Sequence, residues 1–182
     1  MQAELPRSAN VQAPVFLTQA QHAELVRFID EVPTQDPQLL MPVGTIKSGK
    51  STVLRRVLPG LLAAAHATRW PDGRKRPVIF TYEFPLRRDA LAAAVHLRHA
   101  LAEFGQSINV PFDQAPTPSA AFDTLPTALR KFATRVDAAG GELWLLLDEV
   151  QAPVLSSTPN LASDFTYTLK NVSTRDHAVP VH

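Results

Sequence analysis

A glycine-rich segment near residue 50 carries the clearest chemical pattern in the chain. Residues 44–51 read Gly-Thr-Ile-Lys-Ser-Gly-Lys-Ser and match the Walker A pattern G-x-x-x-x-G-K-[ST] at each fixed position. Glycines at both ends permit positive φ angles and a close approach to an anion, and successive backbone N–H groups can point at it. The residues expected to bind phosphates are Gly44, Thr45, Ile46, Lys47, Ser48, Gly49, Lys50, Ser51 and Thr52.

Individual side chains of this loop have distinct expected roles. Lys50 should reach the β and γ phosphates of a nucleoside triphosphate, and the Ser51 hydroxyl should ligate Mg²⁺. A helix that begins near Lys50 would add the positive end of its dipole to the site. The role of Thr52 stays open between capping, packing and a contact with the α phosphate.

A second pattern ends an apolar run in two acids. Residues 145–149 read Leu-Leu-Leu-Asp-Glu, as a Walker B segment does. Ligands of open parallel sheets bind beyond the carboxyl ends of the strands, so these acids should face the same crevice as the phosphate loop. Asp148 is expected to hold Mg²⁺, and Glu149 is expected to orient or deprotonate an attacking water. Together with Lys50, which should contact the phosphates, Glu149 is a candidate catalytic residue. A hydrophobic strand that is followed by a solvated turn can also end in acids. A complete phosphate-loop pattern in the same chain favours instead one site formed by both motifs.

The surrounding elements alternate between strand and helix. Thr18 and Gln21 form a capping box that opens an amphipathic helix, which Pro33 ends. Strand-like runs are expected at 39–43, 77–84, 143–147 and 178–182. Helices are expected from about Lys50 and over 86–104, 125–136 and 161–171.

Three local features carry predictions of their own. Pro59 should kink or break the helix near Leu58, because proline lacks the backbone donor and crowds the preceding turn. Gly105 should end the helix over 86–104. The proline-containing stretches 107–119 and 153–159 should be loops.

This alternation predicts an α/β fold, specifically a three-layer αβα sandwich with a mainly parallel central sheet. The chain has 182 residues, 45% of them hydrophobic, which suits one domain with a substantial core. We expect residues 1–17 to form a flexible leader and residues 18–182 to form the domain.

Composition limits the classes of partner. The 18 basic and 17 acidic residues give a net charge of +1, so no global field draws the chain to nucleic acid or to an anionic membrane. The absence of cysteine excludes disulfides, thiolate zinc sites and cysteine nucleophiles. Neither a secretory signal nor a run of roughly 20 apolar residues is present, so we expect an intracellular protein, cytoplasmic or nuclear, without a membrane partner. Basic residues between 69 and 76 leave nucleic-acid contact open, although such turns are usually solvated.

With both motifs in place, residues 20–182 resemble the P-loop ATPases that carry an additional central strand and a catalytic glutamate, especially the AAA+ and related signal-transduction ATPases. The resemblance implies ATP and Mg²⁺ as ligands and Glu149 as the residue that polarises the lytic water. It also implies that a polar residue at the end of the strand over 77–84, Thr81 or Glu83, restrains that glutamate. An arginine finger, a second sensor and a helical lid would lie beyond His182, so we expect a C-terminally truncated fragment.

Three functions follow from these patterns. The leading hypothesis is Mg²⁺-dependent ATP hydrolysis coupled to a conformational change. The first alternative is a nucleotide-binding switch or scaffold with little turnover, and a small-molecule kinase is less favoured because neither a lid nor an acceptor site is apparent. GTP is disfavoured because the chain has no Asn-Lys-x-Asp motif. A homo-oligomer or a protein partner stays open.

Overall fold

The computed structural model describes residues 17–31 and 49–172. In this part of the chain most residues are helical. The elements are α1 (Gln19–Glu31), α2 (Lys50–Thr52), the π-helix η1 (Val53–Val57), α3 (Leu58–Arg69), β1 (Arg76–Glu83), α4 (Ala90–Ser107), α5 (Pro118–Asp123), α6 (Leu125–Ala138), β2 (Gly141–Asp148), α7 (Gln151–Leu155) and α8 (Pro159–Val172).

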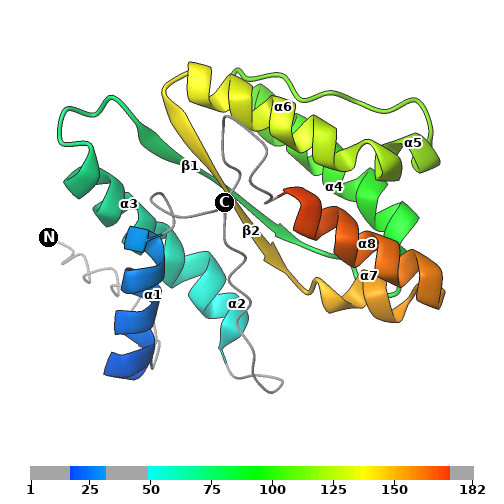
Figure 1. Cartoon of the computed structure of the whole chain (residues 1–182), viewed down its shortest axis with the longest axis horizontal. Coiled ribbons are helices and arrows are strands. Elements are labelled where there is room, and N and C mark those ends of the chain that lie inside the picture. Colours follow the sequence, from blue (N-terminus) through cyan, green and yellow to red (C-terminus); the bar gives the residue numbers. More distant parts are fainter. Residues whose placement is uncertain (1–16, 32–48, 173–182) are drawn as a thin grey trace, which may run out of the picture.

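The two strands form a parallel pair whose register runs from Arg76 opposite Gly141 to Glu83 opposite Asp148. Their carboxyl ends therefore lie side by side at one edge of the sheet. Figure 1 shows α1 and α3 to one side of the strands and α4 to α8 to the other. The described part of the chain is thus a mixed α/β structure with a two-stranded parallel sheet.

Helices pack on both faces of the strands because the side chains of β2 alternate between two apolar clusters. Leu143 joins the larger cluster with α4, α5, α6 and α8, in which Leu125 and Phe132 are fully buried. Trp144 and Leu146 join the smaller cluster with α1, η1 and α3. A strand buried on both faces explains the continuous apolar run that the sequence shows.

Several local predictions are confirmed. The Thr18 N–H donates to Gln21 Oε1 (3.0 Å) and the Gln21 N–H donates to Thr18 Oγ1 (3.2 Å), which is the expected capping box. Helical structure begins at Lys50, and both strands lie within two residues of the predicted runs. The leader up to residue 16 and the strands expected at 39–43 and 178–182 fall outside the described residues.

Of the kink or break expected near Leu58, the break does not occur. The chain stays helical from Lys50 to Arg69, and the disturbance takes the shape of the π-helix η1 just before Pro59. At its end the Leu58 N–H donates to the Val53 carbonyl, five residues back rather than four. A π-turn lets a helix continue past a residue that has no N–H to offer, so the proline is accommodated without a break.

Gly105 does not end a helix, contrary to the prediction. It is buried inside α4, which continues to Ser107, and a Cβ built on it would lie 2.4 Å from the Val110 carbonyl oxygen. The glycine is needed because the following loop folds back against the helix. The start of α4 is also later than expected, at Ala90, because Asp89 caps it by accepting the Ala92 N–H (2.9 Å).

Two short helices lie where loops were expected. Thr117 caps α5 by accepting the Ala120 N–H, so the loop over 107–119 ends two residues early. The segment expected as a loop from Pro153 to Pro159 lies partly within α7. Both helices are shorter than two turns, and a periodic apolar pattern cannot show in so few residues.

The role of Gly105 gives a matched pair of variants. Gly105→Ala should lower the free energy of unfolding by about 1–3 kcal/mol, because the added methyl group forces the Val110 backbone away. Gly60→Ala makes the same change in α3, where nothing lies within 4 Å, and should raise it by about 0.5–1 kcal/mol. Urea unfolding followed by circular dichroism measures both, and equal effects would contradict the close approach.

None of the helices in the described part of the chain is long and apolar enough to cross a membrane.

Candidate functional site

The two strands end in acids that are direct neighbours. Glu83 is the register partner of Asp148, and the Phe84 N–H donates to the Asp148 carbonyl (3.0 Å). The pairing therefore continues to the last residue of each strand. In Figure 1 both strands run toward the end of the molecule where α7 begins. The acids predicted to end a strand lie at its carboxyl edge.

The Asp148 carboxylate is buried and oriented by two donors. Its side chain is 7% exposed. Oδ1 accepts the Glu149 N–H at 3.0 Å, and Oδ2 accepts Arg55 Nη2 at 3.3 Å. A buried carboxylate held by two donors is fixed in direction, as a metal ligand must be.

Arg55 joins the two strand ends. It forms an ion pair with Glu83 as well as with Asp148, and the side chains of Arg55 and Glu83 are 42% and 54% exposed. The hydrogen bond to Glu83 raises the pKa of Arg55 further above its ordinary value. The guanidinium is the positive charge that balances these two acids at the sheet edge.

Arg55 was missed by sequence reasoning, although the sequence holds a signal for it. It lies four residues after Ser51 in continuous helical structure, and residues at that spacing share one helix face. The expected metal-ligating hydroxyl and the arginine therefore belong to the same side of the helix. Its acidic partners, in contrast, come from distant parts of the chain.

The described end of the predicted phosphate loop has a backbone that is compatible with the sequence pattern. Gly49 has φ 88° and ψ 7°, in the left-handed region that favours glycine, and it precedes the first helical residue, Lys50. The Val53 N–H donates to the Gly49 carbonyl at 2.9 Å, which closes the first turn. Residues 44–48 lie outside the described part, so the predicted contacts of Gly44, Thr45, Ile46, Lys47 and Ser48 stay predictions.

Glu149 occupies a tight turn between β2 and α7. Its φ of 55° is left-handed, which is uncommon for a residue other than glycine. The Ala152 N–H donates to its carbonyl at 2.9 Å, and the Gln151 amide donates to its carboxylate. Strained backbone of this kind often occurs at functional sites. The turn places Glu149 at the same sheet edge as Asp148.

Two residues near the end of β1, Thr81 and Glu83, were expected as candidates for restraining Glu149. Glu83 is the last residue of β1 and contacts Arg55, whereas Thr81 lies two residues earlier, opposite Leu146. Of the two, Glu83 is the one that lies beside Asp148. Its contact is with Arg55, and the hydrogen-bond donor found at the Glu149 carboxylate is Gln151.

The basic residues between 69 and 76 are largely engaged within the protein. Arg69 donates to the Ile29 carbonyl (3.2 Å), Lys75 pairs with Asp137, and the Arg74 guanidinium lies 4.0 Å from the centre of the Trp70 ring. These contacts favour a structural role for the turn over a surface that binds nucleic acid.

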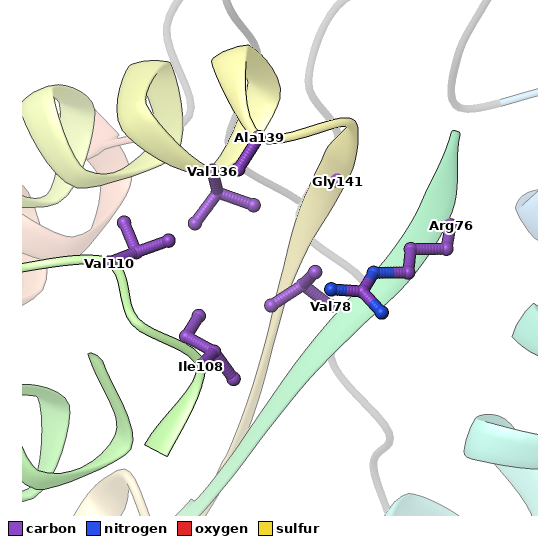
Figure 2. A pocket seen from close by; sticks show the side chains of 7 residues that line it. All are labelled: Arg76, Val78, Ile108, Val110, Val136, Ala139 and Gly141. Carbon is purple, nitrogen blue, oxygen red and sulfur yellow. The ribbon is translucent and has the colours of Figure 1, made fainter. Parts of the chain in front are cut away.

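A small hollow lies far from these acids. Figure 2 shows it between the start of the strands and the end of α6, lined by residues that include Arg76, Val78 and Gly141. Its volume is about 20 Å³, enough for a single water molecule. Because Arg76 and Gly141 begin the strands that Glu83 and Asp148 end, the hollow is at the opposite edge of the sheet. It is not the candidate site.

The described residues contain no group of three or more His, Cys, Asp or Glu side chains that could hold a metal ion. Magnesium in nucleotide sites is commonly bound through one or two carboxylates together with substrate phosphates. Asp148, buried and fixed in direction, fits that arrangement.

Comparison of the chain with family models, with curated proteins and with solved structures found no match.

Proposed function

We propose that this protein binds ATP together with Mg²⁺ and hydrolyses it, with a conformational change as the outcome. The observation that carries the proposal is the contact between Arg55 and Asp148. It links the helical segment that starts at Lys50 to the end of β2, which supports a single site built from the two sequence motifs.

The proposed division of labour follows from the residue types. Residues 44–52 surround the phosphates, and Lys50 places its charge against the β and γ phosphates. Ser51 and Asp148 would hold Mg²⁺, which when bound neutralises phosphate charge and orients the phosphates. Glu149 orients the attacking water and accepts its proton. Such catalysis consists mainly of positioning and charge stabilisation.

A fuller version of the fold belongs to the same proposal. Strands at 39–43 and 178–182 would extend the parallel pair into the central sheet of a three-layer sandwich of the AAA+ type. The helices that cover both faces of β1 and β2 support this version, because such layers can bury a wider sheet. An intracellular location is part of the proposal.

One observation favours the slower alternative, a nucleotide-binding switch. The carboxylate of Glu149 is held by Gln151, and Asp148 is held by Arg55. In this arrangement the two acids are engaged with protein donors, so hydrolysis would require both to be released. ATP binding is common to the two functions and is therefore tested first.

Isothermal titration with ATP and Mg²⁺ tests the proposal. Wild-type protein should bind ATP, and Lys50→Ala should weaken binding by roughly tenfold or more, because a charged hydrogen bond to the phosphates is lost. Lys131→Ala is the matched control, since Lys131 is an exposed lysine on α6. Absence of binding by the wild type, or equal binding by Lys50→Ala, would overturn the proposed function.

A further inference from the structure

Arg55 occupies the position of a counter-ion at the edge of the sheet. Parallel strands lie about 4.8 Å apart, so the adjacent carboxylates of Glu83 and Asp148 repel each other unless a cation lies between them. Arg55 pairs with both of them. The protein thus carries its own positive charge at the acid expected to ligate Mg²⁺.

A metal ion and this guanidinium cannot both stay close to Asp148 at low cost. Magnesium binds carboxylate oxygens at about 2.0–2.1 Å, and a divalent and a monovalent cation near one carboxylate repel strongly where burial limits screening. The Asp148 side chain is only 7% exposed. Binding of one cation therefore weakens binding of the other.

Arg55 is placed so that it can move away from Asp148 and still keep an ion pair. Its side chain is 42% exposed, and its second partner, Glu83, is the more exposed of the two acids. The guanidinium can move toward Glu83 and solvent while it keeps one ion pair. The longer contact, at 3.3 Å, is the one to Asp148.

We propose that Arg55 is a built-in competitor of Mg²⁺: it neutralises Asp148 in the nucleotide-free protein and must be displaced when the metal and nucleotide bind. This inference rests on the proposed function and adds a regulation to that site. Arg55 consequently raises the Mg²⁺ concentration at which nucleotide binding becomes strong. After displacement from Asp148, the Arg55 side chain can still pair with Glu83.

The test measures the affinity of the protein for a fluorescent ATP analogue as a function of Mg²⁺ concentration. The readout is equilibrium binding and does not depend on hydrolysis. Arg55→Gln should lower the Mg²⁺ concentration for half-maximal binding by roughly two- to tenfold, the range expected for the loss of one partly exposed competing ion pair. Arg56→Gln is the matched control. Arg56 is the next residue of η1, is exposed, and should leave the midpoint unchanged.

The outcomes separate the two proposals. An Arg55→Gln midpoint that is unchanged or higher overturns the competition, as does wild-type binding that is independent of Mg²⁺. Absence of wild-type binding at every Mg²⁺ concentration overturns the proposed function itself. Where Arg55→Gln does not fold, Arg55→Lys keeps the charge but loses the two-pronged guanidinium, and its midpoint should also fall, by a smaller factor. An unchanged midpoint in a folded Arg55→Lys protein then counts against the competition.

Discussion

Glu149→Gln should reduce steady-state ATP hydrolysis about 10²–10⁴-fold, the usual contribution of a positioned general base, while ATP binding is retained. Glutamine keeps the size and hydrogen-bonding capacity of the side chain but cannot accept the proton of the attacking water. The left-handed turn at Glu149 and the contact from Gln151 do not require a charged carboxylate. The rate of ATP hydrolysis is measured by phosphate release, and the affinity for ATP is measured by isothermal titration calorimetry.

Glu103→Gln provides the matched control, because Glu103 is an exposed acid on α4 that pairs with His99 on its own helix. Its rate should equal that of the wild type. Hydrolysis by Glu149→Gln at the wild-type rate would remove Glu149 from the mechanism. ATP binding without hydrolysis in the wild-type protein itself would favour the switch.

Arg98→Met should lower the free energy of unfolding by about 3 kcal/mol. Arg98 is buried in α4, with a residue exposure of 2%, and burial lowers its pKa. Its guanidinium donates to the carbonyls of Ala121 (2.7 Å) and Asp113 (2.9 Å) and to Thr124 Oγ1 (2.6 Å). Methionine fills similar space but leaves these acceptors without their donor, and the segment around α5 loses these three hydrogen bonds to α4.

Denaturant unfolding followed by circular dichroism measures this loss. Arg88→Met is the control, because Arg88 is exposed just before α4 and a surface change of this kind should stay within about 0.5 kcal/mol. A loss below about 1 kcal/mol for Arg98→Met would mean that these hydrogen bonds contribute little to stability.

The sequence was informative where the determinants are local. Thr18 and Gln21 satisfy each other's backbone donors within one turn, so the start of α1 could be read from four residues. The apolar run that became β2 needed no distant information, since a strand buried on both faces is apolar throughout. Asp148 directly follows this run in the sequence, so its place at the carboxyl end of the strand also needed no distant information.

Long-range contacts could not be read in this way. Arg55 is separated by 28 residues from Glu83 and by 93 from Asp148, and no local pattern marks their meeting. Gly105 looked like a helix terminator because glycine serves that purpose often, whereas here the approach of the Val110 backbone decides its identity. Pro59 was recognised as a disturbance, but its accommodation by η1 depends on a choice between hydrogen-bond patterns that residue type alone does not make.

The last pair of the strand register has a consequence for the stability of the sheet end. Glu83 and Asp148 bring two acids together at the end of the sheet, and Arg55 offsets their repulsion, so the end of the sheet should be less stable when Arg55 is not in place. Arg55 arrives only when the helical segment after the phosphate loop docks against the strands. Closure of the sheet end and docking of that helix should therefore be coupled, so that loss of either one weakens the other.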